Sequence, residues 1–147
     1  MKFSELGSAI DANEYSSSKR KAMKATVHRS TGRLGFSGEA ANVMGLTEGA
    51  GLLIIRDGAN WFVKVVPFQD NTKAFKINRI SGYYSIAAKG LLEVCGINYS
   101  ALDKTHIFDI QYYAEDEADN AKIWKFVYRL IDSQRKVRKD NTQSNEL

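Results

Sequence analysis

The chain of 147 residues contains little cysteine, proline and histidine. Its one cysteine, Cys95, excludes an internal disulfide, and the usual zinc clusters need more cysteine and histidine than the chain has. No apolar run approaches the length of a membrane span, and residues 1–21 lack the apolar stretch of a signal peptide. We therefore expect a cytoplasmic protein that does not enter a membrane.

Enzyme signatures are also missing. The sequence has no glycine-rich phosphate loop, no nucleophile elbow, and no set of histidine, cysteine and carboxylate residues close together. The adjacent acids Glu115–Glu117 are typical of a solvated loop, and His28 and His106 lack metal-ligand spacing. We expect a protein that is not an enzyme and has no cofactor or bound metal.

Positive charge is concentrated in two blocks, although the net charge is only +4 and the pI about 9.1. The first block, residues 16–33, has six basic residues and no acid: Lys19, Arg20, Lys21, Lys24, Arg29 and Arg33. The second, Lys122 to Lys139, has seven basic residues and the single acid Asp132. Such blocks fit a polyanionic partner or an ordinary solvated surface.

The middle of the chain predicts strands with one short helix between them. Residues 24–30 and 33–37 read as strands joined by the turn "STGR". The following helix has Ser37 as N-cap and Gly45 as its stop, and a hairpin then turns at Asp57-Gly58.

The same order recurs later in the chain. When residues 27–37 are aligned with residues 77–87, Arg29 falls on Arg79 and Gly32 on Gly82. When the alignment is shifted by one residue, "AANVMGL" falls on "LLEVCGI". Trp61 and Trp124 each stand near the start of a final strand. Residues 22–68 and 73–130 therefore read as two ββαββ-like repeats.

A unit of about 45 residues is too small to bury a good core alone, so the two repeats are expected to share one. The predicted fold is mainly β with short helices, a pseudo-twofold β-barrel with interleaved hairpins. Residues 1–21 form a polar leader in which Phe3, Leu6 and Ile10 have the spacing of a short helix. Residues 131–147 form a basic and polar tail that we expect to be disordered.

The repeated unit resembles the AbrB/SpoVT family of swapped-hairpin barrels. The resemblance is carried by "STGRLGFSGEAANVMGLTEGAGLLIIRDGANWFVKVV", with its Gly32-Arg33 turn, the helix end at Gly45, and the hairpin about Asp57-Gly58. In the second copy Gly82-Tyr83 replaces the glycine-arginine pair. Two copies in one chain are similar to the MraZ type of regulator, although that group's acid-to-arginine helix motif is absent.

The resemblance implies transcriptional regulators or antitoxins that bind DNA through arginines of the first strand, the turn and the helix. Arg33 stands at the turn position and Arg29 on the first strand, whereas Ala41 and Asn42 replace the paired helix arginines, and the proline before the helix is missing. The candidate nucleic-acid-binding residues are Arg29, Arg33, Arg79, Lys19, Arg20, Lys21, Lys24, His28, Asn78 and Lys89.

Three functions remain open at this point. The first is a small DNA-binding transcriptional regulator that grips duplex DNA through arginines on turns and strands. The second is a protein-interaction or structural module, such as an antitoxin or an accessory protein of a phage or mobile element, with a partner bound through the tail. The third is binding of single-stranded nucleic acid, with Tyr83 and Tyr84 stacking on bases. Each is compatible with a homodimer.

Overall fold

The computed structural model describes residues 1–11, 22–69 and 73–132. The candidates Lys19, Arg20 and Lys21, and the tail from residue 133, lie outside the described residues. Among those that are described, no helix has the length and apolar content to cross a membrane.

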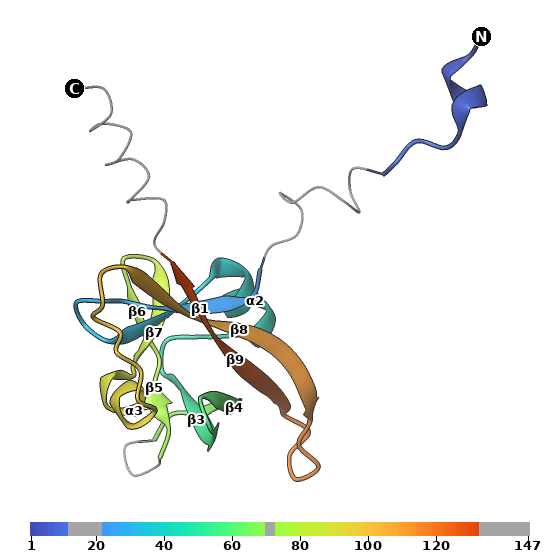
Figure 1. Ribbon diagram of the computed structural model, residues 1–147. Helices are drawn as coiled ribbons and strands as arrows, with labels where there is room; N and C mark the ends of the chain where they lie inside the picture. Colours follow the sequence, from blue (N-terminus) through green and yellow to red (C-terminus); the bar gives the residue numbers. More distant parts are fainter. Residues whose placement is uncertain (12–21, 70–72, 133–147) are drawn as a thin grey trace, which may run out of the picture.

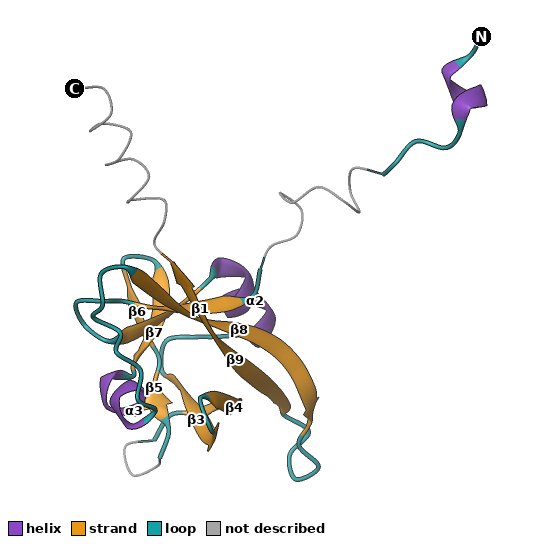
Figure 2. Ribbon diagram, viewed as in Figure 1, coloured by secondary structure: helices purple, strands orange, loops and turns teal. Residues whose placement is uncertain are grey.

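Short helices and nine strands make up the described chain (Figures 1 and 2). In chain order they are the 3-10 turn η1 (Phe3–Leu6), β1 (Lys24–Val27), β2 (Arg33–Phe36), α2 (Gly38–Met44), β3 (Ala50–Asp57), β4 (Asn60–Pro67), β5 (Phe75–Lys76), β6 (Asn78–Ile80), β7 (Tyr83–Ala87), α3 (Lys89–Val94), β8 (Lys104–Glu115) and β9 (Lys122–Asp132). The expectation of a mainly β chain with short helices is confirmed.

The strands form a single antiparallel sheet in the order β5-β3-β4-β9-β8-β1-β2-β7-β6. Its two edge strands, β5 and β6, are separated in the sequence by Ile77 alone. The Ile77 N–H donates to the Ala50 carbonyl at 2.9 Å, which fixes this short stretch against the start of β3. The sheet therefore curls round until its edges meet, in a nearly closed barrel.

Neighbouring hairpins in the barrel come from different halves of the chain. β1 pairs with β8, where Thr26 lies opposite Ile107, and β3 pairs with β5, where Gly51 lies opposite Lys76. β4 also pairs with β9, and β2 with β7. Neither half can complete its sheet without strands from the other.

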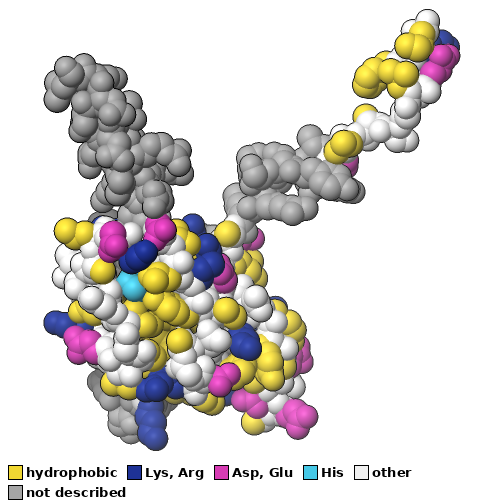
Figure 3. Space-filling view, viewed as in Figure 1, with side chains coloured by type: hydrophobic (Ala, Val, Ile, Leu, Met, Phe, Trp, Pro, Cys, Tyr) yellow, Lys and Arg dark blue, Asp and Glu magenta, His cyan; other side chains and the backbone are white. Residues whose placement is uncertain are grey.

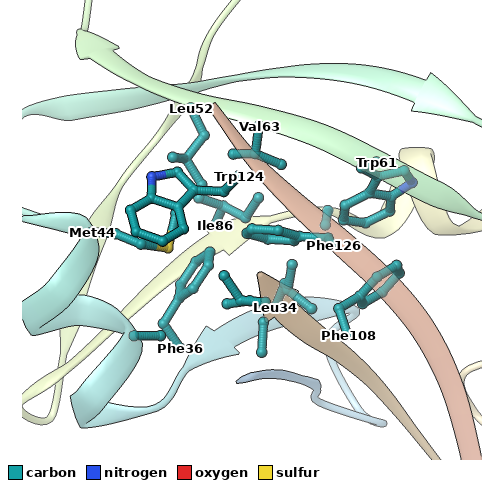
Figure 4. Packing of buried hydrophobic residues seen from close by; sticks show 14 of the residues in the cluster. Leu34, Phe36, Met44, Leu52, Trp61, Val63, Ile86, Phe108, Trp124 and Phe126 are labelled. Carbon is teal, nitrogen blue, oxygen red and sulfur yellow. The ribbon is translucent and has the colours of Figure 1, made fainter. Parts of the chain in front are cut away.

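One hydrophobic core fills the barrel. Side chains alternate between the inside and the outside of each strand, and Trp61, Phe108 and Phe126 are fully buried. Trp61 stacks on Phe108 with ring centroids 4.1 Å apart. Figure 4 shows Phe126 among side chains from several strands, including Leu34 of β2. Trp124 is also in the core and is 4% exposed.

The two helices end in the same way. Gly45 after α2 has φ 70°, Gly96 after α3 has φ 74°, and glycine adopts this left-handed conformation at low cost. The next N–H groups then donate back into the helix, Leu46 to the Ala41 carbonyl and Ile97 to the Leu92 carbonyl. Both turns thereby bring an apolar residue, Leu46 or Ile97, into the core.

The helix starts differ. Ser37 caps α2 as predicted, since its hydroxyl accepts from the Ala40 N–H, whereas Ala88 gives α3 no side-chain cap. Ser37 also accepts from the Lys24 N–H and donates to the Ala22 carbonyl. It thus attaches the segment that enters β1 to the start of α2. Cys95, which follows α3, is half-buried.

Candidate nucleic-acid interface

A groove with a volume of about 670 Å³ runs over the outer face of β1, β2, β6 and β7. The alternation of the strands produces it, because Ala25, Val27, Leu34 and Phe36 point into the core and the residues between them point outward. The residues that line it are Lys24, Thr26, Val27, His28, Thr31, Arg33, Gly35, Phe36, Ser37, Ile80, Ser81, Tyr83 and Ser85.

Arg33 is fixed in this groove by hydrogen bonds to the other half of the chain. Its Nε donates to the Ser85 hydroxyl at 3.0 Å, and its Nη2 donates to Oδ1 of Asn78 at 3.0 Å. Asn78 and Ser85 lie opposite each other on β6 and β7. One half-buried guanidinium therefore connects three strands, and these bonds use two of its five N–H donors.

Lys24 and His28 add polar and basic groups along the same groove. The His28 ring is oriented by a contact of 3.2 Å between Nδ1 and the Ser30 hydroxyl. None of the described residues that line the groove is acidic. Asp109, opposite Lys24 on β8, is itself paired with Arg129 at 2.8 Å. The first-half side of the groove is therefore cationic.

The second-half side carries no charged side chain and exposes Tyr83 and Ile80 beside Ser81 and Ser85. Tyr83 follows Gly82 into β7 as Arg33 follows Gly32 into β2, and both glycines have positive φ. Tyr83 is 68% exposed and its cross-strand neighbour Ile80 is 51% exposed. The two sides of the groove therefore offer different chemistry to a ligand.

The remaining described candidates do not line the groove. Arg29 donates to the Thr105 hydroxyl near the start of β8, at 3.4 Å. Arg79 lies over the ring of Tyr84 at 5.6 Å, and Lys89 begins α3 beside the Gly32 turn. The structure thus brings together Lys24, His28, Arg33 and Asn78, and places Arg29, Arg79 and Lys89 elsewhere.

The sequence alone does not indicate Ser85 or Ile80 as site residues. Their role depends on the pairing of β2 with β7, which joins segments about fifty residues apart. No local sequence pattern predicts this pairing. The sequence indicates Tyr83 only as a residue that could stack on the bases of single-stranded nucleic acid.

Charge on the surface is mixed. In Figure 3 basic and acidic side chains lie close to each other, with hydrophobic side chains between them. In the loop after β8, Asp116 and Asp119 are paired with Lys64 of β4 at 2.9 Å and 3.0 Å. Hydrogen bonds from the Ala118 and Ala121 N–H groups, together with Lys64, hold the pKa of these carboxyl groups below their usual value. The carboxylates of Asp116 and Asp119 are therefore engaged by Lys64 and by backbone N–H groups.

His106 is buried on β8 and lies away from the groove lining. Its Nδ1 is 2.6 Å from the Tyr128 hydroxyl. Burial lowers the pKa of His106, the charge of Arg29 lowers it further, and the Asn98 backbone opposes these effects. Across the described residues, histidine, cysteine and acidic side chains form no group of three that could hold a metal ion.

No protein-family model, curated protein or solved structure matches the chain.

Proposed function

We propose that the chain is a small DNA-binding protein, a transcriptional regulator that binds duplex DNA with the outer face of β1, β2, β6 and β7. The observation that carries this proposal is Arg33, held by Ser85 and Asn78 in a groove that also contains Lys24 and His28. A planar guanidinium suits a phosphate or the edge of a guanine. Cations suit the phosphate backbone, and none of the described residues that line the groove is acidic.

The finer architecture is part of the same proposal. The two halves are repeats of a swapped-hairpin barrel of the AbrB/SpoVT kind, related by a pseudo-twofold axis. The pairing of β1 with β8 and of β3 with β5 supports this, because each half contributes its first strands to the other half's hairpin. The matching helix ends at Gly45 and Gly96 support it as well.

The test is fluorescence anisotropy with duplex DNA across a salt series. The wild-type protein is expected to bind at low salt, with an affinity that falls as salt rises. Lys24→Ala removes one cation and is expected to weaken binding and to reduce the salt slope by about one. Arg33→Ala is expected to weaken binding by about 1–3 kcal/mol if the guanidinium contacts a base edge.

Arg56→Ala is the matched control, because Arg56 is an exposed arginine on β3 outside the groove. It removes the same charge and is expected to change the affinity little. An absence of binding at low salt, or equal effects of Arg33→Ala and Arg56→Ala, contradicts the proposal.

A second candidate function, a protein-interaction module, is favoured by the leader. Phe3 is 79%, Leu6 67% and Ile10 79% exposed, so three large apolar side chains stand in solvent. Apolar residues so arranged suit a protein partner or a second copy of the chain. Light scattering of the wild type and of Phe3→Ser/Leu6→Ser tests binding to a second copy of the chain. Self-association through the leader predicts a smaller assembly for the variant than for the wild type.

A further inference from the structure

A second hollow adjoins the groove, between the turn at residues 81–82 and helix α2. Its volume is about 360 Å³, and its lining residues are Phe36, Gly38, Ala41, Asn42, Gly45, Leu46, Thr47, Gly82, Tyr83 and Tyr84. Phe36 and Tyr83 line both this pocket and the groove. The pocket and the groove therefore meet at the exposed ring of Tyr83.

The position that corresponds to this pocket, between the turn at Gly32 and helix α3, is filled by direct contact between the two. A Cβ atom built on Gly32 would lie 2.9 Å from the Lys89 Cβ and 3.1 Å from the Tyr99 ring, so the Gly32 turn rests directly against the start of α3. A Cβ on Gly82 would meet nothing within 4 Å. The second turn thus stands away from α2, and the pocket is the space between them.

The pocket has the chemistry of a nucleobase site. Tyr83 offers an exposed ring face, and every base has a π-face that stacks on such a ring. Asn42 is exposed on α2, and a carboxamide pairs in bidentate fashion with the edge of adenine. The adjoining groove supplies Lys24 and Arg33 for the phosphates that accompany a base in a strand.

We propose that this pocket binds an unpaired nucleobase, stacked on Tyr83 and hydrogen-bonded by Asn42, while the strand that carries the base follows the cationic groove. This inference rests on the proposed function, since it assigns a nucleic acid to the same face. The preferred ligand is therefore DNA in which a few base pairs of the duplex are open.

The experiment compares a fully paired duplex with the same duplex containing a short unpaired bubble that carries 2-aminopurine. Wild-type protein is expected to bind the bubble roughly tenfold more tightly than the paired duplex, which is the order of one base stacked on an aromatic ring. Binding is also expected to quench 2-aminopurine fluorescence. Tyr83→Ala should remove the preference and the quenching, and Tyr83→Phe should keep both. Asn42 is tested with bubbles that carry adenine or thymine in place of 2-aminopurine, because 2-aminopurine lacks the 6-amino group with which a carboxamide pairs. Asn42→Ala should weaken binding of the adenine bubble more than binding of the thymine bubble.

Tyr112→Ala is the control, because Tyr112 is 53% exposed on β8 and lines neither hollow. It should leave both affinities unchanged. Equal binding of paired and bubble DNA, with the same affinities in Tyr83→Ala, overturns the base pocket and leaves DNA binding intact. No binding of either DNA at low salt overturns the proposed function together with the pocket.

A competition arm distinguishes a base in a strand from a free nucleotide. Excess deoxyadenosine monophosphate that restores the fluorescence of bound bubble DNA assigns the pocket to free nucleotides as well. Failure to compete, with the bubble preference present, assigns it to bases held in a strand.

Discussion

At the scale of single residues, Arg33 contributes to folding as well as to the proposed binding. Its guanidinium donates to Asn78 and Ser85, so Arg33→Ala leaves one half-buried and one buried acceptor without their charged donor. We expect this variant to lose about 1–3 kcal/mol of unfolding free energy, measured by urea denaturation. Arg33→Lys should lose less, because an ammonium group can replace one of the two bonds.

The exposed Arg56 again supplies the control, and Arg56→Ala should change the urea midpoint little. An Arg33→Ala variant as stable as the wild type would show that the two hydrogen bonds add nothing to the fold.

His106 predicts how stability depends on pH. Burial lowers its pKa in the folded protein, so the unfolded chain binds this proton more readily. The contribution of neutral His106 to the free energy of unfolding is complete above the ordinary histidine pKa of 6.5, and it is lost progressively as the pH falls from there toward the folded pKa. The free energy of unfolding, measured by urea titration at a series of pH values, should therefore fall between neutral and mildly acidic pH.

The variant His106→Gln isolates this effect, because glutamine retains a polar group without the titration. Its stability should depend less on pH in this window. Asp116 and Asp119, whose pKa values are lowered, contribute a separate loss of stability at more acidic pH. Equal slopes for the wild type and His106→Gln between neutral and mildly acidic pH would contradict the assignment.

At the scale of elements, the turn glycines form a matched pair. Gly32 and Gly82 have φ of 69° and 83°, so alanine is strained at both positions, by about 1 kcal/mol or more. Only the Gly32 Cβ would also collide with Lys89 and Tyr99. Gly32→Ala should therefore lower the urea midpoint more than Gly82→Ala does. Equal losses would mean that the contact between the turn and α3 relaxes without cost.

The sequence predicts well those elements whose ends are marked by capping or turn residues. Ser37 and Gly45 mark the two ends of α2, and Asp57-Gly58 marks the turn between β3 and β4, because capping and turn chemistry depend on neighbouring residues. α3 has no such capping residue at its start. The interruption between β5 and β6 at Ile77 also has no local cause, since it follows from a contact with Ala50.

The candidate site could be predicted only in part, for the same reason. Basic residues can be identified from the sequence alone, so Lys24 and Arg33 are predicted as candidate binding residues. Whether an arginine points into a groove, as Arg33 does, or toward another strand, as Arg29 does, depends on which strands pair. The aromatic side of the groove and the pocket beside α2 arise from long-range pairing and turn conformation.

At the scale of the whole molecule, the shared core predicts a single cooperative unfolding transition. Trp61 belongs to β4 and Trp124 to β9, and each reports on one half of the chain. The variants Trp61→Phe and Trp124→Phe leave one tryptophan each, and far-ultraviolet circular dichroism provides a probe of the complete sheet. In each variant, fluorescence and circular dichroism should give the same urea midpoint. A fluorescence transition that precedes the loss of the sheet would mean that one half unfolds alone.

The pairing of β1 with β8 also has a consequence during translation. A nascent chain that has released only its first half exposes β1 without its neighbour β8 and β4 without its neighbour β9. Such open strand edges invite pairing with other chains, and contacts of large sequence separation form slowly. Correct closure must therefore wait until the ribosome has delivered β8 and β9, and chaperones that shield strand edges should raise the yield of folded protein.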